Sequence, residues 1–162
     1  MPSQFENPSN PRAHEETTAA EIIADLGGAL DAFVAGIGTG GTITGVGRAL
    51  KQAIPGVRIV GVEPSESAVL SGGEAGPHGI QGIGAGFVPK VLDMSVVDEI
   101  IAVRSEDARA AAHELACSEG ILAGVSSGAA AVAALHVARR LGPGAPVLAL
   151  FPDTGERYLS LQ

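Results

Sequence analysis

The chain has 162 residues, 46% of them hydrophobic, which is enough for one folded domain with its own core and argues against disorder. Its 18 acidic and 10 basic residues give a formal net charge of −8, which disfavours nucleic acid and anionic membranes as partners. A single cysteine, Cys117, excludes an internal disulfide.

No stretch of the sequence is typical of a targeting or membrane segment. Residues 1–12 lack the basic and apolar regions of a secretory signal peptide. The most apolar run, 121–135, is shorter than the ~18 residues that a membrane span needs. We therefore expect a cytoplasmic protein. Cys117 lies on a predicted helix without basic neighbours in sequence, so we expect its thiol to be buried and inert.

The amino-terminal part of the chain predicts a connector followed by a helix. Residues 1–14 contain three prolines and no apolar periodicity, which indicates a connector rather than a packed element. Residues 14–28 predict a helix, with acidic residues near its start and a glycine pair at its end. From residue 15 to residue 162 we expect one α/β domain.

The remaining sequence alternates between predicted strands and predicted helices. Short apolar runs predict strands over 31–37, 57–64, 98–104 and 145–151. Helical patterns lie between them, over 43–54, 105–119 and 126–142. The alternation predicts a three-layer α/β fold, a parallel sheet with helices on both faces.

The glycine-rich segment 71–86 predicts a long loop before the third strand. Ser105, after that strand, is the predicted N-cap of the next helix. So many glycines cannot sustain a helix or a central strand, and long loops in compact domains tend to be functional. In a parallel sheet, ligands bind outside the carboxyl ends of the strands. We therefore expect residues 36–42, the loop after residue 64 and residues 152–156 to meet at that edge.

The stretch 36–45, GIGTGGTITG, leaves three interpretations open. GIGTGG matches G-x-G-x-x-G between a strand and a helix, and Glu63 ends the next strand, where a dinucleotide fold carries its ribose-binding acid. No lysine follows the glycines as a nucleotide-triphosphate loop requires. Thr39 and Thr42 favour a phosphate monoester, because two hydroxyls and the N–H groups of a helix start can saturate one dianion. The third interpretation is a tight turn without a ligand.

A second polar helix start, GVSSGAA, lies at residues 124–130. In a parallel sheet this turn can face the same crevice as the glycine loop. Its serines, Ser126 and Ser127, are also typical N-cap residues. From the residues alone, the N-cap is the simpler interpretation of both.

Five motifs in order resemble those of the cysteine synthases (O-acetylserine sulfhydrylases), within the tryptophan-synthase-β-like family of pyridoxal-phosphate enzymes. They are QFENPSNPRAH, GIGTGGT, GPHGIQGIGAGF, GILAGVSSGAA and PDTGERYLS, which together span nearly the whole chain. The resemblance implies the larger domain of a fold type II enzyme, with pyridoxal 5′-phosphate as cofactor. The implied reaction replaces the acetoxy group of O-acetyl-L-serine with sulfide and gives L-cysteine.

The resemblance implies cofactor-binding roles for two of these motifs. Ser126 would hydrogen-bond the pyridine nitrogen; a neutral hydroxyl there suits elimination and replacement at Cβ. Ser127 would then be the helix cap. The 5′-phosphate would be held by the five residues of the glycine loop, Gly38, Thr39, Gly40, Gly41 and Thr42.

Other matched positions imply contacts with substrate and partner. Gln4 would help bind the substrate carboxylate, and Gly82 and Gly84 would line the substrate entrance. The loop around His78 matches the region where the carboxyl-terminal tail of serine acetyltransferase docks in some relatives. His14 matches a recurrent histidine with a structural role.

Two family motifs have no counterpart in this chain. The Schiff-base lysine of the family lies in an S-V-K-D-R-like motif, whereas Lys51 and Lys90 lie in other contexts and look like solvated surface positions. The S-G-N-T-G-like loop for the substrate carboxylate is also missing. The resemblance thus implies the carboxyl-terminal half of such an enzyme, without a catalytic residue of its own and inactive unaided. Full-length relatives are typically homodimers.

Three other assignments stay open at this point. GERYLS points to a cysteine synthase rather than to a cystathionine β-synthase, but a portion of the latter is the nearest alternative. A non-catalytic module that binds a ligand or a partner is the second. A NAD-binding domain, carried by GIGTGG and Glu63, is the third.

Overall fold

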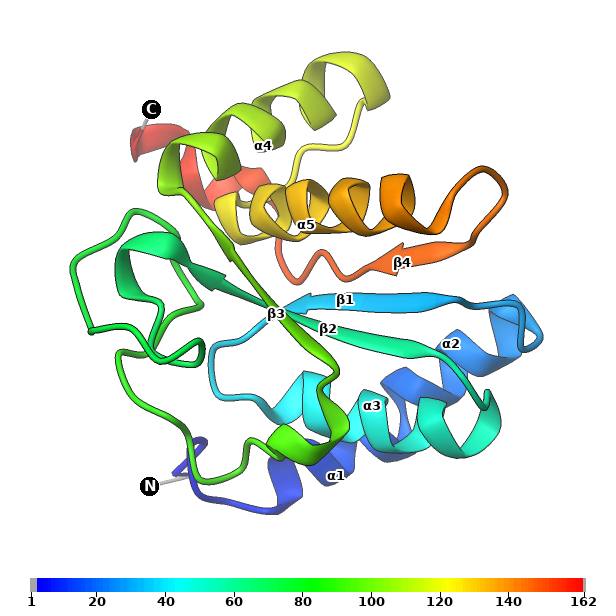
Figure 1. Ribbon diagram of the computed structural model, residues 1–162. Helices are drawn as coiled ribbons and strands as arrows, with labels where there is room; N and C mark the ends of the chain where they lie inside the picture. The colour runs from blue at the N-terminus through cyan, green and yellow to red at the C-terminus, as the bar shows by residue number, and fades with distance from the viewer. Residues whose placement is uncertain (1–2, 162) are drawn as a thin grey trace.

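A four-stranded parallel sheet forms the middle layer of the computed structural model, which describes residues 3–161 (Figure 1). The strands are β1 (Ala32–Gly36), β2 (Arg58–Pro64), β3 (Glu99–Val103) and β4 (Val147–Ala149). Their order in the sheet is β3–β2–β1–β4. In register, Val34 of β1 pairs with Val60 on one side and with Ala149 on the other. All four predicted strands are confirmed, each somewhat shorter than its apolar run.

Helices cover both faces of the sheet. On one face lie α1 (Ser9–Glu16), α2 (Thr18–Leu26) and α3 (Gly41–Ala53), and on the other α4 (Ser105–Glu119) and α5 (Val125–Leu141) (Figure 1). Short 3-10 turns occur as η1 (Ser65–Ser67), η2 (Met94–Val96) and η3 (Gly155–Leu161). The predicted three-layer α/β architecture is therefore confirmed. None of the helices within residues 3–161 is long and apolar enough to cross a membrane.

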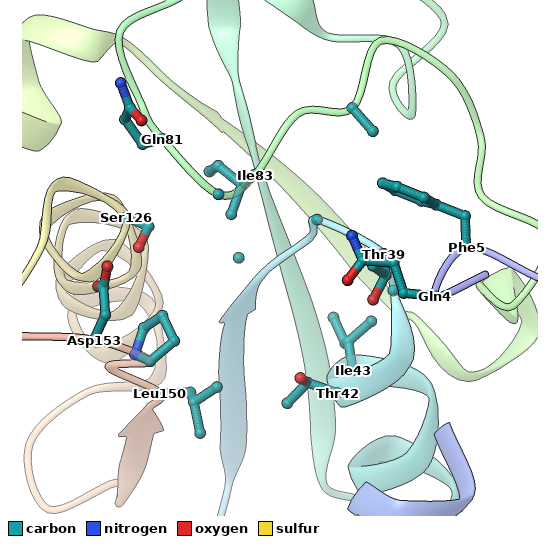
Figure 2. Close-up of a pocket in the computed structure, with 16 residues that line it drawn as sticks. Gln4, Phe5, Thr39, Thr42, Ile43, Gln81, Ile83, Ser126, Leu150 and Asp153 are labelled. Carbon is teal, nitrogen blue, oxygen red and sulfur yellow. The ribbon is translucent and has the colours of Figure 1, made fainter. Parts of the chain in front are cut away.

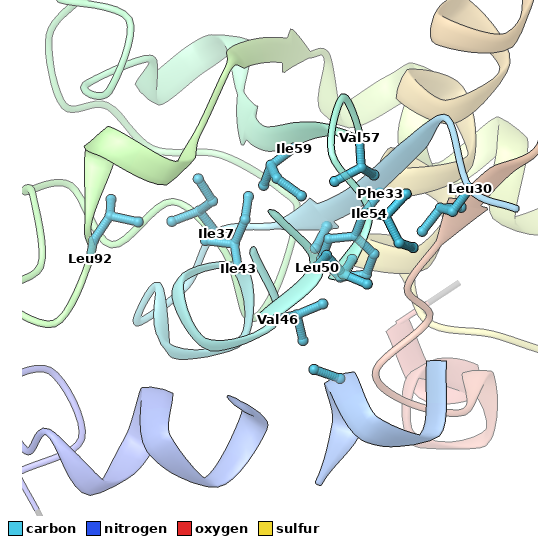
Figure 3. Packing of buried hydrophobic residues seen from close by; sticks show 12 residues of the cluster. Leu30, Phe33, Ile37, Ile43, Val46, Leu50, Ile54, Val57, Ile59 and Leu92 are labelled. Atoms are coloured by element: carbon cyan, nitrogen blue, oxygen red, sulfur yellow. The ribbon is translucent and has the colours of Figure 1, made fainter. Parts of the chain in front are cut away.

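The core is divided by the sheet into two clusters. Along β1, Phe33 and Ala35 face the first cluster while Ala32 and Val34 face the second, as the two-residue period of a strand requires. The first cluster packs β1 and β2 against α3, whose Leu50 is fully buried (Figure 3). Burial on both faces explains why the strands read as continuous apolar runs.

The predicted connector over residues 1–14 is wrong in its second half, because α1 begins at Ser9. Pro8 is the N-cap and Pro11 lies buried in the first turn, where the missing N–H of a proline has no helical acceptor to lose. The predicted helix over 14–28 is in fact two helices. Thr17 separates them, and its hydroxyl donates to the Ala13 carbonyl at 2.7 Å.

Residues 71–86 contain neither helix nor strand, as predicted, and side chains hold them in place. Glu63, at the end of β2, is 1% exposed and accepts the N–H groups of Leu70 at 2.8 Å and Ser71 at 3.0 Å. Further along, the N–H of Ile80 donates to His78 Nδ1 at 3.3 Å. The loop is therefore an ordered wall.

Helix α4 begins differently from the prediction, because its N-cap is Arg104 and Ser105 is the first helical residue. Glu66 satisfies the helix start instead: its carboxylate accepts the Ser105 N–H at 2.8 Å. The Ser105 hydroxyl accepts the N–H of Gly79 at 2.8 Å. Through these two hydrogen bonds Ser105 connects Gly79 of the loop with Glu66 of η1, and its own side chain does not cap the helix.

We expect Glu66→Gln to remove a pH-dependent part of the stability. Burial raises the pKa of Glu66, but the Ser105 N–H and neighbouring hydroxyls outweigh it and hold that pKa at about 2, below the ordinary 4.5. A depressed folded-state pKa stabilises the fold above about pH 4.5, and this contribution is lost as the pH falls towards 2.

Urea unfolding of wild type and Glu66→Gln at several pH values tests this expectation. At pH 7 the variant should be less stable by roughly 1 kcal/mol, a modest value because Glu66 is exposed. The difference should shrink below pH 4.5. Glu74→Gln, at an exposed position of the same loop, is the control and should show no such convergence. A pH-independent gap between wild type and Glu66→Gln would contradict the assignment.

The prediction that Cys117 is buried and inert is wrong about its burial, because Cys117 is exposed on α4. Its sulfur lies 3.7 Å from Nε2 of His113, one helical turn earlier. Neighbouring residues in sequence gave no sign of this contact, because it depends on the four-residue spacing of the helix.

Candidate functional site

A cavity of about 550 Å³ lies at the carboxyl edge of the sheet (Figure 2). The segment after β1, the loop after β2 and the residues after β4 all contribute to its lining, as predicted. The first turn of α5 and residues before α1 complete it, through Ser126 and Gln4. The crevice therefore gathers five separate parts of the sequence around one space.

The start of α3 forms one wall of this cavity. Gly40 is its N-cap, in the left-handed region at φ 84°, and a Cβ there would lie 2.7 Å from the Cβ of Leu92. A Cβ on Gly41 would overlap Oδ1 of Asn10. The first N–H groups of a helix have no intrahelical acceptor and carry the positive end of the helix dipole. Gly38, Thr39, Gly40 and Thr42 line the cavity, so this wall suits an anion.

Helix α1 holds the two threonine hydroxyls of this wall. The side-chain amide of Asn10 donates to Thr39 Oγ1 at 3.0 Å and to the Gln4 carbonyl at 2.8 Å. His14, one turn later on α1, lies with Nε2 3.1 Å from Thr42 Oγ1. Burial lowers the pKa of His14 below its ordinary 6.5, so the ring is neutral at pH 7. His14, for which the resemblance implies a structural role, thus contacts a residue that lines the cavity.

Ser126 and Asp153 lie together on a different side of the cavity from Thr39 and Thr42 (Figure 2). Helix α5 has Gly124 as its N-cap and no side-chain cap, so the N-cap predictions for Ser126 and Ser127 are wrong. Ser127 is fully buried, and its hydroxyl has no hydrogen-bond partner among the described residues. Ser126, 5% exposed, is the serine that lines the cavity.

Asp153 carries the one negative charge of this lining. Its Oδ2 accepts the hydroxyl of Tyr158, and this hydrogen bond, followed by burial, raises the pKa of Tyr158. Its Oδ1 is buried and has no partner among the described residues. A Cβ on Gly124 would overlap that oxygen, so the α5 N-cap must be a residue without a side chain. Asp153 therefore packs tightly against the start of α5.

The structure brings most of the predicted substrate and cofactor residues to this cavity. Gln4 and Gly82 line it, together with the cofactor-binding residues of the two motifs except Gly41. Gly84 does not line it; its carbonyl lies 3.0 Å from His78 Nε2. His78 is half-buried, and its ring contacts the Gly84 carbonyl and accepts the N–H of Ile80 within its own loop.

Sequence reasoning missed several residues of the lining. Phe5, Gln81 and Ile83 all line the cavity (Figure 2), and the ring of Phe5 lies 5.2 Å from that of Phe87. Each of the three is a direct neighbour of Gln4 or Gly82 in sequence. Adjacency in sequence to a predicted contact residue was therefore the signal that could have identified them.

The dinucleotide interpretation loses its acidic residue. Glu63 is buried, both of its carboxylate oxygens accept N–H groups from residues 70 and 71, and it does not line the cavity. A ribose could reach this carboxylate only by displacing the loop. Glu63 is therefore a structural residue of the fold.

Neither lysine of the chain lines the cavity. Lys51 pairs with Asp98 and Lys90 with Glu6, each at 2.7 Å. Lys90 is 74% exposed, as a surface position should be, whereas Lys51 is 35% exposed. The described cavity can thus bind an anion and a polar ring atom, but it contains no amine of its own.

The family described as "Pyridoxal-phosphate dependent enzyme" matches residues 1–153 of this chain. A cysteine synthase of Staphylococcus aureus is 52% identical over 160 residues, which are 98% of this chain and 52% of that protein. The crystal structure of cysteine synthase from Entamoeba histolytica is similar with a TM-score of 0.93 and 46% identity, over 98% of this chain and 47% of that one.

A third relative is named for a different activity. The O-acetylserine dependent cystathionine beta-synthase from Helicobacter pylori is similar with a TM-score of 0.94 and 50% identity, over 98% of this chain and 52% of that one. The chain thus spans about half the length of these relatives.

Proposed function

Because the chain belongs to the family of pyridoxal-phosphate dependent enzymes, we propose that it is the cofactor-binding part of a cysteine synthase. That enzyme would form L-cysteine from O-acetyl-L-serine and sulfide by replacing the acetoxy group at Cβ. One observation carries the proposal: a single cavity has two hydroxyls at the start of α3 on one side and Ser126 on another. The cofactor, when bound, supplies an electron sink for bond cleavage next to the amino group.

The residues of the cavity fit the two ends of pyridoxal phosphate. Gly38, Thr39, Gly40 and Thr42 would hold the phosphate through backbone N–H groups and hydroxyls, and Gly41 would contribute through its N–H, which donates to Thr39 Oγ1. Ser126 would hydrogen-bond the ring nitrogen from the start of α5. Its hydroxyl carries no charge, so it binds that nitrogen without holding a proton on it as a paired carboxylate would.

The remaining lining suits the amino-acid substrate. Gln4 and Gly82 would bind its carboxylate, through a side-chain amide and a backbone N–H respectively. Phe5 forms an apolar part of the wall and is backed by Phe87. Apolar side chains at this position would limit the access of water to the reacting Cβ.

We expect the 162-residue chain to bind the cofactor non-covalently and not to catalyse replacement unaided. A covalent link needs an amine inside the cavity, and Lys51 and Lys90 both lie outside it.

Titration of the chain with pyridoxal phosphate, followed by absorbance and calorimetry, tests the proposal. Pyridoxal phosphate should bind at least about 100-fold more tightly than pyridoxal, because the phosphate makes several charge-assisted hydrogen bonds. No band near ~420 nm should form, since no lysine reaches the aldehyde. Equal affinity for the two aldehydes would refute the phosphate site, and a strong ~420 nm band would refute the absence of a reacting lysine.

A cystathionine β-synthase-like enzyme is the second candidate, favoured by the similarity to the Helicobacter pylori protein. Both candidates start from the same cofactor and differ in the sulfur nucleophile that attacks Cβ. For the longer enzyme we further propose a homodimer, and a partner peptide such as an acetyltransferase tail near the loop of His78. This loop is ordered by its own hydrogen bonds, so it would offer a preformed surface.

A further inference from the structure

At both threonine hydroxyls at the start of α3, neighbouring groups decide in which direction the hydroxyl proton points. Thr39 Oγ1 accepts two N–H groups, from Asn10 Nδ2 at 3.0 Å and from Gly41 at 3.2 Å. A hydroxyl has two acceptor sites and one proton. With both acceptor sites used, the proton of Thr39 is left to donate, and Thr39 lines the cavity.

Thr42 depends in the same way on His14. The ring of His14 lies between two hydroxyls, with Nδ1 3.1 Å from Thr18 Oγ1 and Nε2 3.1 Å from Thr42 Oγ1. If Nε2 carries the proton, it donates to Thr42, and Thr42 is free to donate into the cavity. If Nδ1 carries it, Nε2 accepts the Thr42 proton, and Thr42 offers an anion no donor.

We propose that Asn10 and His14 are positioning residues that make both hydroxyls donors to a phosphate monoester dianion, with the proton of His14 on Nε2. This inference rests on the proposed cofactor site and assigns a function to α1 within it. The two residues are one turn apart and thus on the same face of α1. Gly41 allows the close approach, because any Cβ there would overlap Oδ1 of Asn10.

Electrostatics around the ring are consistent with a neutral imidazole. Burial is the cause that lowers the pKa of His14. The charged residues of the three packed helices are Arg12, Glu15 and Glu16 on α1, Glu21 and Asp25 on α2, and Arg48 and Lys51 on α3. Arg12 pairs with Glu16 at 2.6 Å, and Arg48 pairs with Asp93 at 2.7 Å. The ring therefore acts through its tautomer and not through a charge.

The experiment has two independent readouts on the 162-residue chain. Nitrogen NMR of the His14 ring at pH 8 reports the tautomer directly, and we expect the proton on Nε2. Calorimetry with pyridoxal phosphate and with inorganic phosphate reports the affinity. His14→Phe should weaken both ligands about 10-fold, since the Thr42 hydroxyl loses the donor that fixes its orientation towards the anion. His14→Gln, whose amide can still donate to Thr42, should restore most of the affinity.

A double-mutant cycle separates this role from a general loss of structure. Thr42→Val removes the hydroxyl through which His14 acts, so His14→Phe should cost nothing further in that background. His136→Leu, at an exposed position on α5, is the matched control and should bind as wild type does. Thermal melts of all variants identify any that fail to fold.

The outcomes distinguish this inference from the proposed function. A proton on Nδ1, or equal losses from His14→Phe with and without Thr42, would overturn the inference even if pyridoxal phosphate binds tightly. If inorganic phosphate binds as tightly as pyridoxal phosphate and both depend on His14, the inference holds and the cofactor assignment fails. A wild-type chain that binds neither ligand overturns both.

Discussion

Gly38→Ala is expected to weaken the binding of pyridoxal phosphate at least tenfold, about 1.4 kcal/mol. A Cβ at residue 38 would overlap the carbonyl oxygen of Gly82, so the glycine loop and the loop after β2 would have to separate. The carbonyl oxygen of Gly82 is a backbone atom, and a Cβ is attached directly to the backbone. Neither atom can therefore rotate away as the end of a flexible side chain would. Because the two loops form adjoining parts of the cavity wall, the separation would move the N–H donors from the phosphate. Calorimetric titration with pyridoxal phosphate measures the loss.

The control for Gly38→Ala is the same substitution at Gly128. A Cβ there would overlap the carbonyl of Ala108, which disturbs the packing of α5 on α4 and not the lining of the cavity. Overpacking of this kind costs about 1–3 kcal/mol of stability. Gly128→Ala should thus lower the melting temperature with little change in affinity at 25 °C. If Gly38→Ala binds as wild type does, the two loops are not held backbone to backbone.

Glu63→Gln is expected to lower the free energy of unfolding by about 2–3 kcal/mol, which is the scale of a lost hydrogen bond to a buried charged group. The carboxylate accepts from Leu70 and Ser71, whereas an amide can accept only one of these N–H groups. Its NH₂ would then face the second N–H, and a buried donor would stay unsatisfied. Urea unfolding gives the change, and affinity for pyridoxal phosphate should also fall, because the loop beyond Ser71 forms the cavity wall.

Glu21→Gln on α2 serves as the control for Glu63→Gln. Glu21 is an exposed helix residue and should tolerate the change within roughly 0.5 kcal/mol. The same pair of variants tests the dinucleotide interpretation, in which Glu63 would bind a ribose. A variant with native stability and weakened NADH binding would restore that interpretation. A large loss of stability with no NADH binding in wild type would end it.

Elements with a local pattern could be predicted from the sequence. The apolar runs that became β1 and β2 are buried on both faces, and the helix predicted over 43–54 ends before Pro55 and Gly56 as expected. The carboxyl-edge location of the site followed from the parallel direction of the strands, since parallel strands end at the same edge. These inferences needed neighbours in sequence and the rules of sheet topology.

Two of the failures share a physical cause, which is a partner distant in sequence. Ser105 looks like an N-cap, but Glu66 supplies the acceptor from 39 residues away. His14 meets Thr42 across 28 residues, so no local pattern could place it beside the start of α3. Ser127 looks like a cap because its neighbours are typical of a helix start, yet its hydroxyl is buried without a partner among residues 3–161. Contacts between elements far apart in sequence decided the first two cases.

The strand order has a consequence for how this chain behaves at high concentration. With β3 and β4 outermost, each presents backbone groups to which a strand of another molecule could add. Strand β4 has only three residues, with Pro146 before it and Pro152 shortly after, and proline cannot donate to such a ladder. On β3, Glu99 is paired with Arg140, which places charge at the border. The short length of β4, its flanking prolines and the ion pair on β3 thus disfavour amyloid-like association through the two edge strands.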